Sequence, residues 1–324
     1  MKAVQLNGFE GLSSLQITEV EKPRPGATEV LLEVRAAGIN FAEIEMTKGR
    51  YPAARKLPFV MGFEAAGIVV EAGPQAKNVK VGDKITAIVS SGGYAEYATA
   101  DAGFVIPIPD GISFAEAATI PVHGLSAYAL LRFAAKPQPN ESLLIQAAAG
   151  GVGLYLVQLA KILGVKKVIA LASSKEKTDL VASLGADVVI NYSNGNWPDQ
   201  VREATGGKGV DIVLEAASGA VGEESFKLAA PFGRIVVFGA KNIHDTMSSE
   251  QIRQIVYKNQ SVIGFNVPTL RSEQIGECVP LLLNLIAQGK LRFFASNSFP
   301  LSQVKEAFDA LSSRRTIGKV VLVP

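Results

Sequence analysis

Short apolar runs alternate with segments of helical character between residues 142 and 240. Helices are expected over 151–163, 175–184, 197–204 and 222–230. The apolar runs that separate them are SLLIQA, KKVIALA, DVVIN, VDIVLEA and RIVVFGA. Strands buried on both faces are apolar along their whole length, and successive parallel strands require a crossover that is usually a helix. The pattern predicts an α/β fold with a doubly wound parallel sheet.

The first 110 residues have a different rhythm of short strand-like segments separated by turn signals. The segments are AVQLN, LQITEV, EVLLEVRAAGIN, AAGIVVEAG, DKITAIV and YAEYATA. They predict a mostly β unit. The tail after about Arg292 is again strand-like and could return to this unit. A chain of 324 residues is long enough for about two domains.

A glycine-rich turn joins the first apolar run of the α/β region to its first helix. Ala148, Gly150 and Gly153 have the spacing A-x-G-x-x-G, which differs from the dinucleotide fingerprint at its first position. Such a turn lets the backbone approach a pyrophosphate, which then lies at a helix N-terminus. The predicted contacts are Ala149, Gly150, Gly151 and Val152. The turn alone is weak support, but its place at the start of the alternating pattern strengthens the prediction.

The end of the second apolar run indicates which dinucleotide binds. An NAD-binding chain usually places a carboxylate there, against the ribose 2′-hydroxyl. This chain has Ser173 and Ser174, followed by Lys175 and Lys177. Hydroxyls and an ammonium suit a 2′-phosphate, so NADP(H) is expected as cofactor. Alternatively, a serine caps the next helix and the lysines face solvent.

Composition argues against several classes of function. The 32 basic and 30 acidic residues give a net charge of +2, and no long run carries one sign, so nucleic acid and membrane surfaces are not expected partners. The single cysteine, Cys278, excludes an internal disulfide and a multi-cysteine zinc site. No secretory signal is expected at the N-terminus, and the predicted location is cytoplasmic.

Eight stretches together resemble one family along essentially the whole chain. They are RAAGINFAEI, GRYP, LPFVMGFEAAGIVVEAG, VGDKI, GGYAEYA, AAAGGVGLYLVQLAK, LGADVVINY and IGKVVLVP. The chain resembles a zinc-free member of the medium-chain dehydrogenase/reductase superfamily, in the NADPH:quinone oxidoreductase group that includes zeta-crystallin. The resemblance implies a GroES-like domain over 1–121 and 292–324 and a Rossmann NADP(H)-binding domain over 122–291, with the active site in the cleft between them.

The resemblance also implies the chemistry. Zinc-dependent relatives carry a cysteine and a histidine where this chain has Asn40 and Phe63, so no metal site is expected. What remains is hydride transfer from NADPH to a quinone or another α,β-unsaturated carbonyl compound. The resemblance nominates Asn40 as a hydrogen-bond donor to the electrophile's oxygen and Tyr51 at the cleft mouth as catalytic residues. Asn40 could instead hold a turn, and Tyr51 could instead be a packing residue.

Further cofactor contacts follow from the resemblance by position. They are Ser126, Tyr192, Phe238, Gly239, Phe265 and Val267. Tyr192 could instead only pack. Glu64, near the cofactor in the family, is expected to be a structural hydrogen-bonding residue, and a lone histidine such as His123 is more often structural than catalytic.

Two other functions stay open. An enoyl-CoA or enoyl-thioester reductase has the same fold, and a crystallin-like or RNA-binding protein could retain NADPH without turning it over. The run NQSVIGFN would be a sixth strand at the sheet edge. An exposed apolar edge strand must be paired or covered, so a homodimer is expected.

Overall fold

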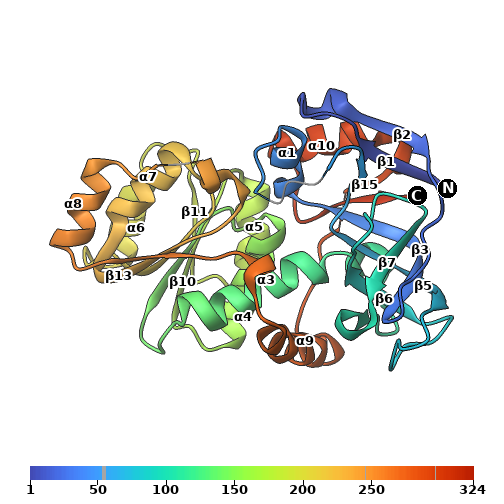
Figure 1. Cartoon of the computed structure of the whole chain (residues 1–324). Coiled ribbons are helices and arrows are strands. Elements are labelled where there is room, and N and C mark those ends of the chain that lie inside the picture. The colour runs from blue at the N-terminus through green and yellow to red at the C-terminus, as the bar shows by residue number, and fades with distance from the viewer. Residues whose placement is uncertain (53–55, 245, 296) are drawn as a thin grey trace. The chain divides into compact units, whose positions relative to one another are not determined.

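The computed structural model describes residues 1–52, 56–244, 246–295 and 297–324. Contacts divide the chain into unit 1, formed by Met1–Gly124 and Val279–Pro324, and unit 2, formed by Leu125–Cys278 (Figure 1). The family resemblance implies domain boundaries after residues 121 and 291, and these bounds stay a prediction. The second boundary between the two units, after Cys278, lies inside helix α9 (Ser272–Ala287).

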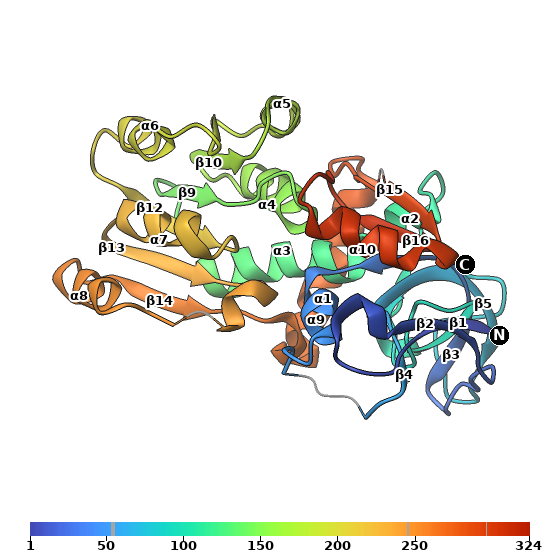
Figure 2. The same ribbon diagram turned by 90° about the horizontal axis from the view of Figure 1, so that it is seen from above.

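Unit 2 contains the predicted parallel sheet. Its strands are β9 (Ser142–Ile145), β10 (Lys167–Ala172), β11 (Val188–Asn191), β12 (Val210–Glu215), β13 (Ala229–Val237) and β14 (Ser261–Gly264). The six strands are parallel and ordered β11-β10-β9-β12-β13-β14. Figure 2 shows β10, β9, β12, β13 and β14 in this order across the unit. This is the doubly wound order, with its topological switch between β9 and β12. The predicted fold class is confirmed.

Helices connect these strands. They are α3 (Leu125–Ala129), α4 (Gly151–Ile162), α5 (Lys175–Ser183), α6 (Trp197–Ala204), α7 (Gly219–Leu228) and α8 (Ser249–Tyr257), with the π-helical segment η4 (Leu130–Ala135) and the 3₁₀ turns η5 (Ala240–His244) and η6 (Val267–Thr269). Helices α4, α5 and α6 agree with the expected ranges to within one residue. Helix α7 begins three residues earlier than expected, directly after Ser218.

Unit 1 is built from two sheets whose strands pair antiparallel, except that β15 and β16 are parallel. Its strands are β1 (Lys2–Leu6), β2 (Leu15–Glu19), β3 (Glu29–Ile39), β4 (Phe59–Val60), β5 (Glu64–Ala72), β6 (Lys84–Ile88), β7 (Tyr97–Asp101), β8 (Ile106–Pro107), β15 (Asn297–Pro300) and β16 (Val320–Val323). A small sheet has the order β2-β1-β4, and a larger one has the order β15-β16-β3-β5-β6-β8, with β7 also paired to β3. Strand β16 therefore joins the C-terminal segment to the long N-terminal strand β3.

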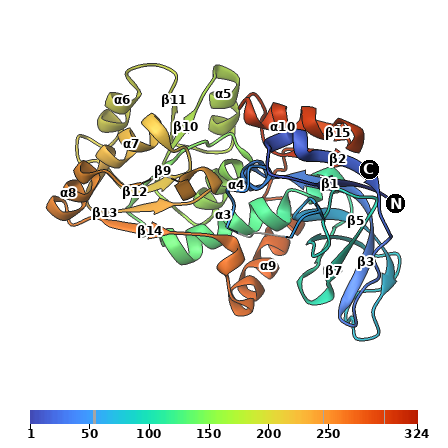
Figure 3. The same cartoon turned by 45° about the horizontal axis from the view of Figure 1, so that its top comes forward.

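The remaining elements of unit 1 are short. They are α1 (Phe41–Thr47), α2 (Phe114–Ala117), α10 (Val304–Ser312), the 3₁₀ turns η1 (Gly11–Ser14), η2 (Ala102–Phe104) and η7 (Leu301–Gln303), and the π-helical turn η3 (Ile120–Gly124). The prediction of a strand-like tail is only partly correct, because α10 lies between β15 and β16, and Figure 3 shows it beside β15. No helix in the described ranges is both long and apolar enough to cross a membrane.

Each unit has its own core. In unit 2, Leu144, Ile169, Val213 and Ile235 come from four neighbouring strands and are fully buried. In unit 1, residues of β1, β3 and β5 pack with Phe308 of α10. Fully burying one such side chain stabilises the fold by about 1.5–3 kcal/mol. These cores fix the strand ends on which the polar side chains described next are placed.

Candidate functional site

The predicted cofactor contacts of unit 2 gather at one edge of its sheet. Ala149 to Val152 follow β9, Ser173 and Ser174 follow β10, and Tyr192 follows β11. Phe238 and Gly239 follow β13, and Phe265 and Val267 follow β14. Because the six strands are parallel, their carboxyl ends meet at the same edge, which is where open α/β sheets bind ligands. Ser126 is the exception, since it lies buried in helix α3.

The glycine-rich turn brings helix α4 close to strand β9. Ala147 has a φ of 46°, and the Gly150 N–H donates to the Ala147 carbonyl at 2.8 Å, which closes the turn. A Cβ on Gly153 would lie 2.3 Å from the Ala147 carbonyl oxygen and 2.7 Å from the Ala148 Cα. Position 153 therefore needs glycine for the helix to begin so close to the strand.

The N-terminus of α4 fits a phosphate group. Its N-cap, Gly150, makes no side-chain capping hydrogen bond, and no acidic side chain lies in the first turn of the helix. The N–H groups at a helix start are directed along the axis and favour a negative charge. A pyrophosphate held by the backbone of Gly151 and Val152 would supply the missing acceptors.

Two of the groups predicted to contact a 2′-phosphate, Ser173 and Lys177, lie close together beyond β10. Ser174 caps helix α5 by accepting from the Lys177 N–H at 3.4 Å, as the alternative interpretation expected. The Lys177 ammonium nevertheless points back to the Ser173 hydroxyl, at 3.5 Å. Burial lowers the pKa of Lys177. Lys175 is different, because its ammonium pairs with Asp179 at 2.7 Å on the exposed side of the helix.

Tyr192 directly follows the neighbouring strand β11, which is hydrogen-bonded to the end of β10. Its N–H donates to the Ala172 carbonyl at 3.0 Å, and the Ser193 hydroxyl donates to the Ser173 carbonyl at 3.0 Å. The ends of β10 and β11 are thereby joined. The Tyr192 side chain packs against the hydrophobic core of unit 2, as the packing alternative expected, and the polar contact at this edge is between Ser173 and Lys177.

Sequence reasoning missed a buried polar pair at the topological switch. Gln146 follows β9 and Glu215 ends β12, and the Gln146 amide donates to the Glu215 carboxylate. Gln146 Oε1 accepts from the Ala217 N–H at 2.9 Å, and Glu215 Oε1 accepts from the Ser218 N–H at 2.8 Å. Together they hold the backbone of 216–218, where Ser218 has a φ of 54°. A polar residue ending each of two apolar runs, LLIQ and IVLE, was the available signal.

The contacts beyond β13 and β14 are held by backbone bonds. Phe238 N–H donates to the Glu215 carbonyl at 2.9 Å, and Phe265 N–H donates to the Val237 carbonyl at 3.0 Å. Asn242 Nδ2 donates to the Glu215 and Phe238 carbonyls, both at 3.0 Å. These bonds keep the two aromatic residues at the same sheet edge as the glycine turn.

Asn40, in unit 1, is part of a buried polar network. It lies between β3 and α1 and is 5% exposed. Its Nδ2 donates to Glu64 Oε1 at 3.0 Å and to Glu43 Oε2 at 3.3 Å, while its Oδ1 accepts from Lys319 Nζ at 2.6 Å. An amide nitrogen has two N–H groups, and both are directed at carboxylates here. The side chain therefore joins three charged groups.

Lys319 is the residue of this network that sequence reasoning missed. It directly precedes β16, is 1% exposed, and forms a fully buried ion pair with Glu64. A Cβ on Gly38 would lie 2.3 Å from Lys319 Cε and 2.7 Å from Glu64 Oε1, so this glycine makes room for the pair. The available signal was a lysine beside the apolar run VVLV. Glu64 is a hydrogen-bonding residue, as expected.

A second carboxyl group, Glu43, completes the network. Its Oε2 accepts from the Asn40 N–H at 2.9 Å and from the Tyr94 hydroxyl at 2.6 Å. Burial raises the pKa of Glu43 to about 7, although both hydrogen bonds and the charge of Lys319 lower it. Burial and the neighbouring Glu43 also raise the pKa of Tyr94 well above its ordinary value. Glu43 therefore exchanges its proton near neutral pH.

His123 contacts the same network from the π-helical turn η3. Its Nε2 lies 3.1 Å from Lys319 Nζ, and the preceding Val122 N–H donates to Glu64 Oε2 at 2.8 Å. Burial lowers the pKa of His123 well below its ordinary value, and the positive charge of Lys319 lowers it further. The imidazole is therefore neutral at physiological pH.

Tyr51, the second predicted catalytic residue, packs near this network. Its ring centroid lies 6.0 Å from that of Phe63, which directly precedes Glu64. Asn40 thus contacts Glu64, and Tyr51 contacts the residue before it, Phe63. The tyrosine contributes to the hydrophobic packing of unit 1, as the packing alternative expected.

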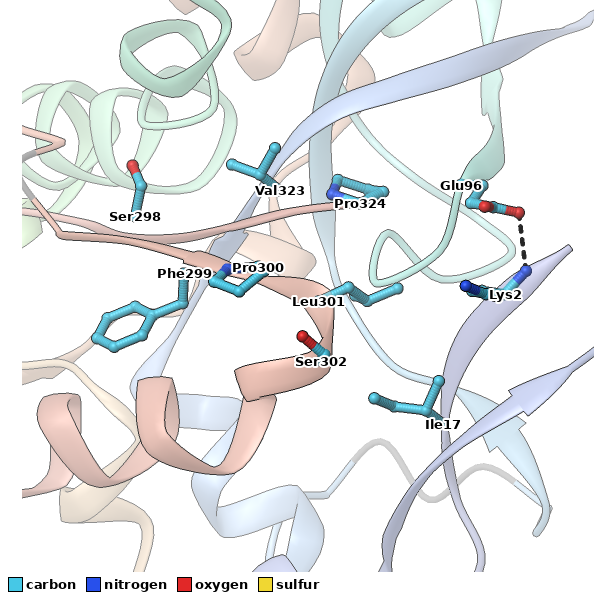
Figure 4. Close-up of a pocket in the computed structure, with 10 residues that line it drawn as sticks. All are labelled: Lys2, Ile17, Glu96, Ser298, Phe299, Pro300, Leu301, Ser302, Val323 and Pro324. Carbon is cyan, nitrogen blue, oxygen red and sulfur yellow. Dashed lines mark hydrogen bonds between the residues drawn. The ribbon is translucent and has the colours of Figure 1, made fainter.

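A cavity lies elsewhere in unit 1. It has a volume of about 520 Å³ and is lined by residues of β1, β2, β15, η7 and β16, among them Lys2, Ile17, Phe299 and Val323 (Figure 4). The Lys2 N–H donates to Glu96 at its rim, at 2.8 Å. None of the predicted site residues lines it. Across the described ranges, no three His, Cys, Asp or Glu side chains are grouped to hold a metal ion.

Comparison with known proteins identifies both parts of the chain. Residues 26–110 match the family described as alcohol dehydrogenase GroES-like domain, and residues 151–284 match the family described as zinc-binding dehydrogenase. A quinone oxidoreductase from Pseudomonas aeruginosa is 33% identical over 329 residues, which cover 100% of this chain and 99% of that protein.

Solved structures extend the comparison to the fold. The quinone oxidoreductase of Escherichia coli, solved in complex with NADPH, is 31% identical, with a TM-score of 0.91 and complete coverage of both chains. The CurK enoyl reductase is 29% identical, with a TM-score of 0.89 over 99% of this chain and 98% of that one. The chain thus belongs to the medium-chain dehydrogenase/reductase superfamily, within its quinone oxidoreductase group.

Proposed function

We propose that the protein is an NADPH-dependent oxidoreductase that transfers a hydride to quinones or other α,β-unsaturated carbonyl compounds. The observation that carries the proposal is the row of polar and glycine residues along the carboxyl edge of the β9–β14 sheet, from the α4 turn to Ser173 and Lys177. Similarity over the full length to quinone oxidoreductases, one of them solved with NADPH, supports it.

The side chains at this edge fit NADPH better than NADH. The turn before α4 would hold the pyrophosphate, and the Ser173 hydroxyl with the Lys177 ammonium would hold the 2′-phosphate. The bound cofactor supplies the hydride, and the chain supplies its orientation. Gln146 and Glu215 contribute by fixing the loop at 216–218 beside the same edge.

We assign Asn40 a positioning role. Its two N–H groups already donate to Glu64 and Glu43, so a direct hydrogen bond to the substrate would require one of these bonds to break. Its proposed role is to hold Lys319, Glu64 and Glu43 in position by hydrogen bonds. Tyr51 keeps its proposed place beside the substrate.

The reaction is proposed to proceed without zinc. The Lys319 ammonium lies against Glu64 and Asn40, so a positive charge already occupies this side of the carboxylate. A divalent cation beside it would be repelled, and Asn40 and Phe63 offer no thiolate or imidazole. The description of the matching family as zinc-binding therefore does not extend to this site. A cytoplasmic location stays a prediction.

A homodimer is part of the proposal. Strand β14 ends the parallel sheet, and Val262 on it is 38% exposed. Exposed apolar side chains continue over the neighbouring β13 and α8: Phe232, Ile252, Val256 and Tyr257. A second copy that pairs along β14 would cover the open edge and this apolar surface.

The function is tested by the oxidation of NADPH and of NADH with quinones, short enones and enoyl-CoA esters, before and after treatment with a chelator. We expect oxidation of NADPH with quinones or enones and no loss on chelation. Preference for the CoA esters would favour the enoyl-thioester reductase, for which the CurK similarity is the specific observation. Bound NADPH without turnover of any compound would favour the non-enzymatic alternative.

The cofactor assignment is tested by Lys177→Ala. Loss of a charged hydrogen bond costs about 1.5–3 kcal/mol, so the affinity for NADPH should fall about 10- to 100-fold while the affinity for NADH changes little. Lys175→Ala is the matched control, because Lys175 pairs with Asp179 and should leave both affinities unchanged. Fluorescence titration measures each dissociation constant. Equal losses for the two cofactors would contradict the assignment.

A further inference from the structure

We propose that His123 donates the proton that the reduction requires, and that the Lys319 ammonium returns a proton to it. This proposal rests on the proposed function and adds the proton source, which hydride transfer alone does not supply. It follows from the hydrogen bonds of the buried network in unit 1.

The hydrogen bonds of Lys319 fix the tautomer of His123. A lysine ammonium has three N–H groups and no acceptor. Its three neighbours are Asn40 Oδ1 at 2.6 Å, Glu64 Oε1, and His123 Nε2 at 3.1 Å. The histidine nitrogen must accept, because the ammonium can only donate. The neutral imidazole therefore carries its proton on Nδ1.

The Nδ1–H of His123 points to no acceptor within the part of the chain that the structure describes, although Nδ1 itself is buried. A buried donor without a partner destabilises the fold and requires an explanation. A substrate oxygen would supply the missing acceptor. The ring is thus held by one nitrogen and directed toward a ligand by the other.

The backbone of η3 holds the ring in this orientation. The Gly124 N–H donates to the Thr119 carbonyl at 3.3 Å, a π-type bond that places His123 in a widened turn. Such turns occur frequently at functional sites. The Val122 N–H donates to Glu64 Oε2, while Glu64 Oε1 accepts from Lys319. One carboxylate therefore fixes both the ammonium and the turn that carries the imidazole.

The proposed step balances as follows. The hydride of NADPH adds to the β-carbon of the enone and leaves an enolate. The enolate takes the proton of His123 Nδ1, while Nε2 takes a proton from Lys319 Nζ. The products are the saturated ketone, NADP⁺, the other neutral tautomer of His123 and a neutral Lys319 amine. His123 Nδ1 then takes up a proton from water while Nε2 returns its proton to the Lys319 amine, which restores both groups, so one NADPH and one proton are consumed in each turnover.

The charges around this pair favour the transfer. Burial lowers the pKa of Lys319, so the ammonium gives up a proton more readily than it would in water. Burial and the charge of Lys319 lower the pKa of His123, so the imidazole is neutral between turnovers. The titratable groups that face the pair are Glu64 on Lys319 and, one contact further, Glu43 with Tyr94. Glu64 stabilises the ammonium between turnovers.

Enones and quinones should depend differently on His123. Hydride addition to an enone leaves an enolate, which is strongly basic and needs a positioned acid. Hydride addition to a quinone leaves the anion of an aromatic hydroquinone, which is far less basic and takes its proton from water. General acid catalysis contributes about 10²- to 10⁴-fold where the acid is needed.

The experiment compares His123→Gln with the wild type. Gln can still accept from Lys319 but cannot pass a proton between two ring nitrogens. We expect kcat for an enone to fall about 10²- to 10⁴-fold, kcat for a quinone to fall less than about tenfold, and the dissociation constant of NADPH to stay within about twofold. The wild-type solvent isotope effect on enone turnover should change in the variant. His244→Gln replaces the other histidine and should match the wild type.

Two results would overturn the proposal. One is unchanged enone turnover in an active protein, and the other is an equal loss for enones and quinones with weakened NADPH binding, which indicates a structural role. ¹⁵N NMR of wild-type His123 gives an independent reading, since a proton found on Nε2 also contradicts the relay. A wild-type protein that oxidises NADPH with neither enones nor quinones contradicts the proposed function itself, and with it the proposed proton source.

Discussion

At the scale of single residues, the buried ion pair depends on a glycine, because position 38 has no room for a side chain. Gly38 lies against Lys319 and Glu64, and any Cβ there would overlap both. The Lys319 and Glu64 side chains are fully buried, so neither charged group can reach solvent if the ion pair is displaced. Breaking a buried pair is costly because it leaves uncompensated charges.

Gly38→Ala should therefore destabilise the protein by about 1–3 kcal/mol, the usual cost of overpacking. Its Cβ would lie 2.3 Å from Lys319 Cε and 3.0 Å from the Ala118 carbonyl oxygen. Gly276→Ala is the control, because its Cβ would lie in open space within α9, where alanine favours a helix by about 1 kcal/mol. Urea unfolding measures both variants. A Gly38→Ala protein as stable as the wild type would contradict the packing.

Glu43 gives the network a dependence on pH. Burial raises the pKa of Glu43 from 4.5 to about 7, so the folded state binds its proton more tightly than the unfolded state does. The contribution of this group to stability is complete below pH 4.5 and is lost as the pH rises to about 7, a total of roughly 3 kcal/mol. Glu43→Gln cannot titrate and keeps an acceptor for Tyr94.

The free energy of unfolding of the wild type, relative to Glu43→Gln, should therefore fall as the pH is raised from about 4.5 to 7 and level off above that. Urea unfolding of both proteins at a series of pH values measures the difference. A difference that rises with pH, or stays constant, would show that burial does not raise this pKa.

At the scale of elements, the α4 turn combines a tight backbone with the helix end that is proposed to bind the pyrophosphate. Helix α4 begins directly after Gly150, and Gly153 lies against Ala147 and Ala148. The helix start and its distance from β9 cannot change independently. Any side chain at position 153 therefore affects both stability and cofactor binding.

Gly153→Ala should lower the melting temperature and reduce the further increase in melting temperature that NADPH produces in the wild type. The added Cβ would lie 2.3 Å from a backbone oxygen, which can move only if the helix moves. Gly195→Ala, with open space around its Cβ, is the control in the same unit. Thermal unfolding with and without NADPH measures both effects. An unchanged stabilisation by NADPH would remove the α4 turn from the cofactor site.

Elements were predictable where their signal was local. The strands β9 to β13 and helices α4 to α6 follow from apolar runs and turn residues within short windows. Helix α10 was missed although Val304, Ala307, Phe308 and Leu311 have helical spacing, because the neighbouring strands dominated the interpretation of the tail. The cofactor edge followed from parallel topology, since the topology aligns strand ends that lie far apart in the sequence.

The network in unit 1 could not be predicted in the same way. Asn40 and Glu64 were identified from family motifs, but Lys319 is separated from them by 279 and 255 residues. No local pattern pairs residues at such distances. The role of Asn40 was affected by this. The resemblance nominated its side chain as a donor to the substrate, and in the structure the side chain donates to the Glu64 and Glu43 carboxylates.

At the scale of the whole molecule, the open edge of the parallel sheet indicates assembly. Val262→Lys places a charge on β14, the strand that the proposed partner would cover, and should convert the dimer into a monomer. Val81→Lys is the control, since Val81 is 62% exposed in unit 1 and lies far from this strand in the sequence. Analytical ultracentrifugation measures the mass of each. A Val262→Lys dimer would place the interface elsewhere.

The pairing of β16 with β3 also sets an order of events during synthesis of the chain. Asn40 leaves the ribosome 279 residues before Lys319. At about 5–20 residues per second, this gap lasts roughly 14–56 s. During that interval Glu43 and Glu64 have no ammonium to neutralise them, and by its end all the strands of unit 2 have been made. Unit 2 can thus fold first on the ribosome, and unit 1 is completed only after Lys319 has been synthesised.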